Sequence, residues 1–393
     1  MSCSKPNYDI EKCGKLKGNP MKILVIPTTD WIRHPFPNRL NFIFDILAEK
    51  HEVYVLHFNL ENFRNNRPRK TACKLVDTKF IDVGDPSLYY LLNWPEHLLE
   101  MRKVIKKEGI DVVLSANILP SFIINFLNVP VVFDYLDHLE ESASIYYPDS
   151  FFGKIVKNGV RQITRYNLRH ATSVITVTRE LKDFLEGIRV KNIEVIPNGV
   201  NCNLLRPLPK EEAKKELGLK GAVIGYVGSL EHWVDLEMVV ESLPDLEVSL
   251  LVVGPGLFTD YGDQIKELAN KLGVSEKITF TGAVPYEDLG PYISAMDIGL
   301  NTLKKMDKNE YAAGGKVFNY LACGRPVLSS RTISLVRMLG DDLYYYDDKD
   351  GFIREVKRIL ETPTNEDRYR EIAKTFDWEV LARKYEEVLR KSI

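Results

Sequence analysis

The chain has 393 residues, 45% of them hydrophobic, which is enough for two domains that each bury a core. Its formal net charge is -2, which argues against a dedicated nucleic-acid-binding protein. The five cysteines are scattered without a C-x-x-C pair, so neither a zinc site nor a disulfide framework is indicated, and a reducing cytoplasm is favoured. No apolar run reaches the length of a membrane span, and polar residues 1–20 are expected to form a disordered tail.

Short apolar runs alternate with helical patterns from residue 21 onward. The first predicted strand is 21–27, and a helix is predicted at 97–107. Further strands are predicted at 51–58, 79–83, 111–115, 129–134, 173–177 and 193–196. Strictly alternating strands and helices predict a parallel sheet with helices on both faces.

The loop after the first predicted strand has no G-x-G-x-x-G motif, which argues against a dinucleotide-dependent dehydrogenase. Loops in this position lie over the ligand crevice of an open α/β sheet. We therefore predict that Trp31, Arg33 and Arg39 face a sugar or a phosphate. Arg39 is equally well explained as a surface charge on the helix predicted at 38–49.

A polar cluster follows the strand predicted at 129–134, where strand ends meet the cleft. Asp137 and His138 are the catalytic candidates, because they could bind sugar hydroxyls or handle an acceptor proton. The alternative is that Asp134 or Asp137 caps the N-terminus of a following helix.

The helix predicted at 151–170 concentrates cations on one face. These cations recur at three- and four-residue spacing: Lys154, Lys157, Arg161, Arg165 and Arg169. Such a face can contact anionic lipid heads or a lipid-phosphate acceptor. An ordinary crossover helix with a solvated face is the alternative.

Prolines and turn residues at 197–209 indicate a domain boundary. The second domain then opens with a strand, a tight turn and a helix at 222–235. Gly228 and Ser229 at the turn would let the backbone approach a pyrophosphate closely, whereas bulky side chains would hold it away.

The stretch 314–327 is the strongest candidate for a ligand site. Adjacent glycines open a helix predicted at 315–322, and Gly324 closes it. Exposed N–H groups around Gly315 and the charge of Lys316 would bind phosphate oxygens, and Asn319 shares that helix face. The alternative is a flexible loop followed by a solvated lysine.

This stretch resembles the K-x-x-E-Y-L-A-x-G-x-P-V signature of retaining glycosyltransferases of the GT-B fold, a family that includes capsule and teichuronic acid glycosyltransferases. The segment P-N-G-V-N at 197–201 is similar to the connection between that family's domains. In the family the lysine neutralises donor phosphate and the glutamate binds ribose. Here Asn319 replaces that glutamate, and Tyr311 replaces another glutamate eight residues earlier.

The resemblance implies an α/β protein of the GT-B fold, with two doubly wound, Rossmann-like parallel sheets facing a cleft. We expect an acceptor domain at 21–196, a nucleotide-sugar domain at 197–362, and helices at 363–393 that cross back to the first domain. By the same resemblance, the backbone around Gly282 and Val284 contacts the nucleotide base.

The activity implied is hexosyl transfer, with retention, from a nucleotide-diphosphate sugar to a glycan or lipid-linked acceptor, without a metal or cofactor. We expect it in the cytoplasm or at the inner face of the membrane, in polysaccharide biosynthesis. Two alternatives are a nucleotide-sugar epimerase of the same fold and a catalytically inactive nucleotide- or glycan-binding homologue. The second is suggested by Tyr311 and Asn319.

Overall fold

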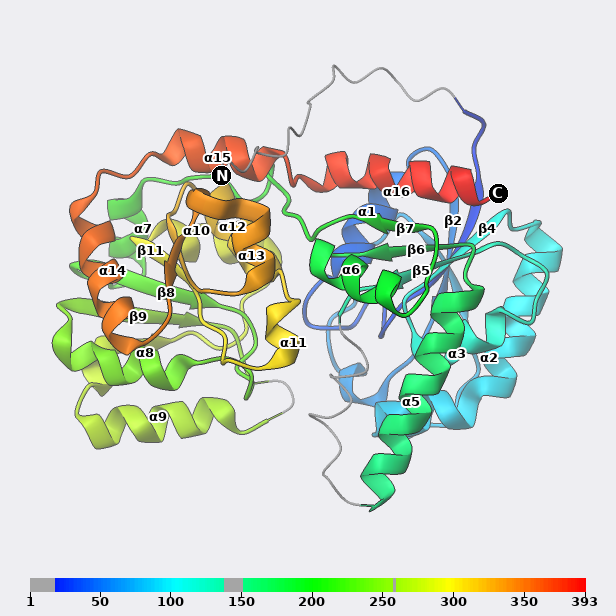
Figure 1. Ribbon diagram of the computed structural model, residues 1–393, viewed down its shortest axis with the longest axis horizontal. Coiled ribbons are helices and arrows are strands. Elements are labelled where there is room, and N and C mark those ends of the chain that lie inside the picture. Colours follow the sequence, from blue (N-terminus) through cyan, green and yellow to red (C-terminus); the bar gives the residue numbers. More distant parts are fainter. Residues whose placement is uncertain (1–17, 138–150, 257–258) are drawn as a thin grey trace.

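The computed structural model of the protein describes residues 18–137, 151–256 and 259–393, and Figure 1 shows two α/β units side by side. Most of the predicted tail therefore lies outside the described residues. One sheet has seven strands in the order β3-β2-β1-β4-β5-β6-β7, and the other has six in the order β10-β9-β8-β11-β12-β13. Neighbouring strands in both sheets are parallel, which confirms the predicted pair of doubly wound sheets.

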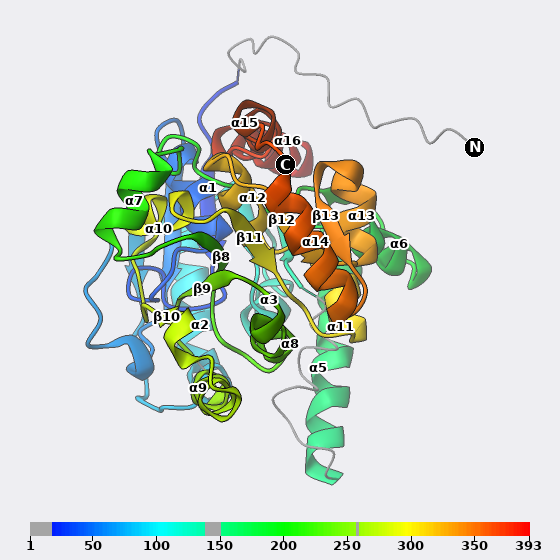
Figure 2. The ribbon, with the colours of Figure 1, turned by 90° about the vertical axis from the view of Figure 1, so that its left-hand side faces the viewer.

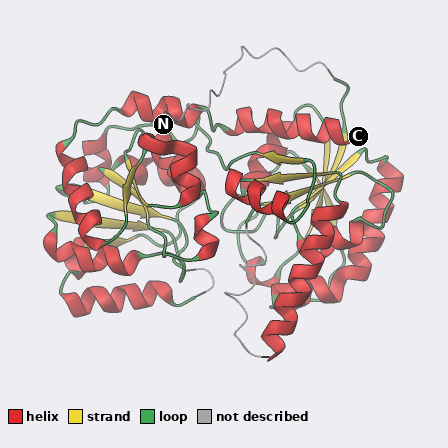
Figure 3. Ribbon diagram, viewed as in Figure 1, coloured by secondary structure: helices red, strands yellow, loops and turns green. Residues whose placement is uncertain are grey.

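The first sheet is covered by helices on both faces (Figure 3). Apolar residues of α1 and α16 pack on one face, and those of α2 pack on the other. The strands are β1 (Lys22–Ile26), β2 (Glu52–His57), β3 (Lys74–Asp77), β4 (Val112–Ser115), β5 (Val131–Tyr135), β6 (Ser173–Thr176) and β7 (Ile193–Val195). The helices before the second sheet are α1 (Arg39–Leu47), α2 (Pro86–Glu108), α3 (Ile118–Ile124), α5 (Phe151–His170), α6 (Arg179–Gly187) and α7 (Lys210–Glu216).

The second sheet is also packed on both faces, with α8, α9 and α14 on one side and α10 and α12 on the other. Its strands are β8 (Ala222–Val227), β9 (Val248–Val253), β10 (Ile278–Phe280), β11 (Ile298–Asn301), β12 (Val327–Ser330) and β13 (Tyr344–Tyr346). Its helices are α8 (Leu236–Ser242), α9 (Tyr261–Leu272), α10 (Leu289–Ser294), α11 (Asp307–Glu310), α12 (Gly315–Ala322), α13 (Ile333–Leu339) and α14 (Lys349–Glu361).

The last two helices lie along the top of both units in Figure 1, and Figure 2 shows them from the side. Helix α15 (Glu366–Lys374) packs on α12, whereas α16 (Trp378–Ser392) packs on α1 of the first unit. The domain boundary proposed at 196/197 falls between β7 and α7, and it stays a prediction. Among the described helices, none is both long and apolar enough to cross a membrane.

Two local predictions were wrong. The strand predicted at 79–83 is absent; β3 lies earlier, and the side chains of Phe80 and Ile81 are exposed. Helix α2 begins at Pro86 rather than at residue 97 and includes Pro95. Pro95 removes one intrahelical N–H, but Leu91 and Pro95 are on the exposed side, where water can satisfy the freed carbonyl.

Candidate functional site

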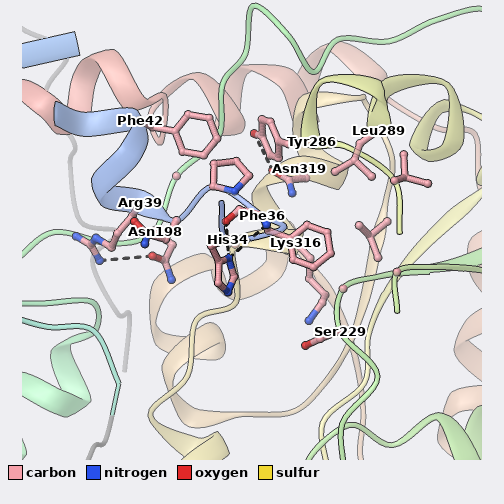
Figure 4. Close-up of a pocket in the computed structure, with 18 of the residues that line it drawn as sticks. His34, Phe36, Arg39, Phe42, Asn198, Ser229, Tyr286, Leu289, Lys316 and Asn319 are labelled. Atoms are coloured by element: carbon pink, nitrogen blue, oxygen red, sulfur yellow. Dashed lines mark hydrogen bonds between the residues drawn. The ribbon is translucent and has the colours of Figure 1, made fainter. Parts of the chain in front are cut away.

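A cavity of about 520 Å³ lies between the two units, at the carboxyl ends of β8 and β9. This is where open parallel sheets bind ligands. The first unit contributes the loop after β1 and the start of α1, and the second contributes the turn after β8 and the N-terminus of α12. Figure 4 shows how side chains from both units point into the cavity.

Glycines form the wall contributed by β8 and β9. Gly228 has a φ of +145°, and a Cβ there would lie 3.1 Å from the Cε atom of Lys316. Gly254 has a φ of +134°, and a Cβ there would lie 2.1 Å from the Gly228 carbonyl oxygen. The Tyr226 hydroxyl donates to the Ser229 carbonyl over 2.8 Å and fixes the turn. The absence of side chains leaves room for Lys316 and for a ligand beside the backbone.

Lys316 lies in the first turn of α12, and its Nζ atom is 5.0 Å from the centre of the Tyr226 ring. Burial lowers the pKa of Lys316 to about 8. No carboxylate in the described part of the chain forms an ion pair with it. A cation at the positive end of a helix, with no carboxylate partner among the described residues, suits an anionic ligand such as a phosphate.

Asn319 follows Lys316 by one turn and lines the same cavity. Its Oδ1 atom accepts a hydrogen bond from the Tyr286 hydroxyl over 3.4 Å. The Tyr286 oxygen in turn accepts from the backbone N–H of Asn201 over 3.2 Å. The link between the units therefore helps to orient the amide of Asn319.

Aromatic rings close the upper end of the cavity. The Phe42 ring from α1 is stacked on Trp378 of α16, with a centroid distance of 5.4 Å. Phe42 also contacts Tyr286 of the second unit at 4.9 Å. This contact joins the two units directly beside Asn319.

Arg39 lines the cavity, but its guanidinium group is largely engaged by the protein. It donates to the Ile196 carbonyl over 2.7 Å and, more weakly, to Asn198 over 3.5 Å. Its Nε atom is 3.7 Å from the buried carboxylate of Asp134, which also accepts from the Tyr385 hydroxyl. Burial raises the pKa of Asp134, and Arg39 opposes that shift. The alternative that Arg39 is a surface charge on the helix is wrong, because the side chain is 5% exposed.

The other predicted residues lie at different places around the cleft. Val284 lines the cavity; Gly282 does not, but its carbonyl accepts from the Gly254 N–H over 2.9 Å. Arg33 lines an adjacent cavity of about 840 Å³. Trp31 is buried in the core of the first unit, with its indole N–H bonded to Thr71.

Asp137 is not in the cavity wall, although its neighbour Leu136 is. Its carboxylate lies 3.3 Å from the Lys308 ammonium of the second unit. Lys308 in turn lies over the ring of Trp233, 4.4 Å from its centre. Asp137 therefore bridges the units at the edge of the cleft. His138 lies outside the described residues.

The side chains that line the cavity suit an anionic ligand. Among the described lining residues there is no Asp or Glu, whereas Lys316 and Arg39 are cations. His34 also lines the cavity, and burial lowers its pKa, so its imidazole is neutral at pH 7. The wall thus offers positive charge, backbone N–H groups and hydrogen-bonding amides to a ligand.

Sequence reasoning missed several lining residues because it treated their segments as structural. Asn198 was assigned only to the domain connection, although its Nδ2 atom donates to the Ala313 carbonyl beside the glycine pair. Asn38 was counted only as the start of a helix, and it does cap α1. Asn38 could have been identified from the sequence, because it ends the loop after β1 that was expected to lie over the ligand crevice.

Two family descriptions match successive parts of this chain. Residues 45–204 match Glycosyltransferase Family 4, and residues 221–362 match Glycosyl transferases group 1. The 2-deoxystreptamine glucosyltransferase of Streptomyces kanamyceticus is 27% identical over 237 residues, which are 56% of this chain and 59% of that protein. The putative teichuronic acid biosynthesis glycosyltransferase TuaH of Bacillus subtilis (strain 168) is 26% identical over 241 residues, 59% of either chain. The chain thus spans about three fifths of the length of these relatives.

Solved structures share the fold over most of the chain. A sucrose-phosphate synthase from Thermosynechococcus elongatus has a TM-score of 0.75 at 17% identity, and the match covers 94% of this chain and 98% of that one. Anabaena Alr3699/HepE in complex with UDP has a TM-score of 0.71 at 18% identity, covering 94% and 100%. At these identities the similarity shows the fold alone.

Proposed function

Since this chain belongs to the glycosyltransferases of group 1 and family 4, we propose that it moves a hexosyl group from a nucleotide-diphosphate sugar to a glycan or lipid-linked acceptor, with retention of configuration. The donor would occupy the cavity between the units. The acceptor would approach from the first unit, which carries Asp137 at the edge of the cleft.

The observation that carries this proposal is the position of Lys316 against the glycine turn after β8. When the bond between sugar and diphosphate breaks, negative charge grows on the diphosphate. A preorganised ammonium and the N–H groups of a helix terminus stabilise that charge more in the transition state than in the bound donor. The lowered pKa of Lys316 supports this role. It shows that burial destabilises the charged ammonium, and a bound anion would stabilise it.

Uridine diphosphate is the nucleotide to test first, because HepE has been solved with UDP and with UDP-glucose. In the proposed complex the diphosphate lies in the cavity against the turn at Gly228 and the Nζ atom of Lys316. The ribose then lies near Asn319, and the base near Val284. Asn319 would donate or accept a hydrogen bond to a ribose hydroxyl without adding charge.

Handling of the acceptor proton is assigned to Asp137 or His138. Asp137 is bonded to Lys308 across the cleft, so its carboxylate is held close to where an acceptor would enter. The cationic helix α5, on the same unit, would contact anionic lipid heads at the inner face of the membrane when the acceptor is lipid-linked.

A second candidate, nucleotide-sugar binding without transfer, is favoured by one observation at Tyr311. Its backbone carbonyl accepts from the Thr178 hydroxyl of the first unit over 3.1 Å, and its ring packs near Phe184. A tyrosine held in this way supplies no carboxylate to the sugar.

The deciding experiment is product analysis with a panel of nucleotide sugars, beginning with UDP-glucose, and a panel of glycan and lipid-linked acceptors. A glycosylated product with the anomeric configuration of the donor, seen by NMR, supports the proposal. An isomerised nucleotide sugar would indicate the epimerase, and binding without a product would indicate the inactive homologue. Lys316→Ala should slow transfer, whereas Lys305→Ala, an exposed lysine in the loop before α11, should not.

A further inference from the structure

Helix α2 exposes a row of large apolar side chains. Leu88, Leu92, Pro95 and Leu99 follow a four- and three-residue spacing, and Leu91 lies beside them. The four leucines are 45–60% exposed. Contiguous leucines on an outer helix face are unusual, since monomeric proteins rarely leave such a patch in water.

This face is held rigidly by the opposite side of the helix. Tyr89, Asn93, His97 and Met101 are buried against the first sheet. Asn93 also bonds both the N–H and the carbonyl of Ile81, which fastens the segment before the helix to this buried side. We call Leu88, Leu91, Leu92 and Leu99 the apolar face of α2. Its exposure does not arise from a loosely attached helix.

The same row continues as positive charge. Arg102 and Lys106 extend the spacing of the leucines toward the C-terminal end of α2, and both are exposed. Neither has an ion-pair partner among the described residues. Trp94 is 45% exposed on the flank of the helix, where an aromatic ring with a polar N–H suits the boundary between apolar and polar surroundings.

The charge of the surrounding layer of helices is predominantly positive. Helices α2, α3 and α5 are neighbours on the first unit, and Figure 1 shows them together at the lower right. Helices α3 and α5 contain no Asp or Glu, and the three helices carry nine Lys and Arg against three Glu. In a chain with a net charge of -2, this layer is strongly cationic.

We propose that the apolar face of α2 docks the first unit on an anionic lipid bilayer. The leucines enter the boundary between headgroups and acyl chains, while Arg102 and Lys106 meet the phosphates. The inference adds an insertion surface to the proposed function, and vesicle binding tests it without any transfer reaction.

A second copy of this chain fits the face less well. In an antiparallel pair of α2 helices, Lys106 of one copy would lie against the leucines of the other. In a parallel pair, Arg102 and Lys106 would meet their own copies. The row from Leu88 to Lys106 holds no carboxylate that could neutralise them.

The test is flotation of the full chain with vesicles of equal parts phosphatidylcholine and phosphatidylglycerol. We expect binding to these vesicles and at least tenfold weaker binding to phosphatidylcholine alone. Leu88→Gln, Leu91→Gln and Leu99→Gln together should weaken binding to the anionic vesicles at least tenfold. The matched control replaces Leu204, Leu272 and Leu360, exposed leucines of the second unit and its connection, with Gln and should bind like the native chain.

A second measurement reports insertion directly. Brominated phosphatidylglycerol should quench part of the tryptophan fluorescence, and Trp94→Phe should remove that quenching. Trp31 and Trp378 are buried, and Trp233 lies beneath Lys308. Unchanged melting temperatures and unchanged uridine diphosphate binding would show that the Gln variants keep their fold and donor site.

Three results would overturn the inference. One is no binding of the native chain to anionic vesicles, and another is equal binding to neutral and anionic vesicles. The third is native-like vesicle binding by the triple Gln variant. If the native chain does not bind vesicles but forms a dimer, and the triple Gln variant is a monomer, the face is instead an interface between copies.

Discussion

The ammonium of Lys316 is held close to the Tyr226 ring, and none of the described residues that line the cavity around it carries a carboxylate. Lys316→Ala is therefore expected to weaken nucleoside diphosphate binding by about 1.5–3 kcal/mol, the scale of a hydrogen bond to a charged group. Binding of the nucleoside alone should barely change, because the base and ribose would contact other residues. Titration calorimetry at pH 7 measures both, with Lys305→Ala as the control. Equal diphosphate affinity in the native chain and in Lys316→Ala would remove the main support for the donor site.

The pKa of Lys316, lowered by burial to about 8, predicts a pH dependence. The charged form needed for an anion is fully populated well below pH 8, so diphosphate affinity should decline as the pH rises through 8. Between pH 8 and the ordinary lysine pKa of about 10.4, the unfolded chain binds the extra proton, so this lysine makes the free energy of unfolding rise with pH. Calorimetry across pH 6.5–9.5 should show the decline in the native chain and a flatter profile in Lys316→Ala.

Arg39 is expected to act on stability rather than on phosphate binding. Arg39→Ala leaves the buried Asp134 carboxylate without its cation and should lower the free energy of unfolding by about 3–5 kcal/mol. Arg33→Ala, whose guanidinium makes only a 3.4 Å contact with Asn59, should cost less than about 1 kcal/mol. Urea unfolding compares the two. A stable Arg39→Ala protein with weak diphosphate binding would restore the phosphate role.

The burial of Arg39 could not be predicted from the sequence. Its partners Ile196 and Asp134 are far away in the chain, and Tyr385 reaches it only when α16 crosses onto the first unit. Lys316 was different. Its place at the start of α12 depends on glycines within a few residues, and such local signals are visible in the sequence. Its contacts with Tyr226 and Gly228 are not local and were not visible.

At the scale of elements, α12 shows why local signals succeed. Its predicted bounds, 315–322, match the structure, and Gly324 ends it with a φ of +71°. The N–H groups of Gly324 and Arg325 bond back to Leu321 and Tyr320, as expected for a helix closed by glycine. The bounds predicted for helix α2 and strand β3 were wrong because tertiary packing, and not the local sequence, determines where these elements begin. A proline in α2 and two apolar residues near 80 gave the opposite local signal.

Gly324 also lies against Glu366 of α15. The cost of crowding this contact can be measured separately from the cost of the left-handed backbone. Gly324→Ala would force an alanine into a left-handed conformation, which destabilises the fold. Its Cβ would also lie 2.9 Å from the Cβ of Glu366. Gly273→Ala has a similar φ of +68° with open space around the Cβ, so it should cost only the backbone term, roughly 1–2 kcal/mol. We expect Gly324→Ala to cost at least about 1 kcal/mol more in thermal or urea unfolding. Equal losses of unfolding free energy in the two variants would mean that α15 shifts away from the new Cβ at little cost.

At the scale of the whole molecule, the parallel pairing in the sheets follows from alternating strands and helices, whereas the cleft between the sheets was expected from the family resemblance. Neither signal predicts the contacts that set the width of the cleft. They join residues distant in the sequence, such as Phe42 with Tyr286, and Arg337 of α13 with Glu180 and Asp183 of α6. Each of these contacts joins common residue types that have no local sequence signature. Only the folded chain therefore shows which residues pair.

The cluster around Arg337 supplies the last prediction. Arg337→Glu would set three carboxylates together across the two units, and their repulsion should favour a more open cleft. We expect a larger radius of gyration in solution scattering and up to about tenfold weaker diphosphate binding, given that exposed ion pairs contribute about 0.2–1 kcal/mol each. Both changes should shrink at high salt, because these charges are partly exposed.

The matched control is Arg331→Glu, because Arg331 pairs with Asp347 inside the second unit and its loss should leave the cleft unchanged. Adding Glu180→Lys and Asp183→Lys to Arg337→Glu reverses every charge of the cluster and should restore the native scattering curve and affinity. If Arg337→Glu scatters like the native chain at low salt, the width of the cleft is set elsewhere. The aromatic contact of Phe42 with Tyr286, which salt does not screen, would then be the structure that holds the two units at the distance a donor requires.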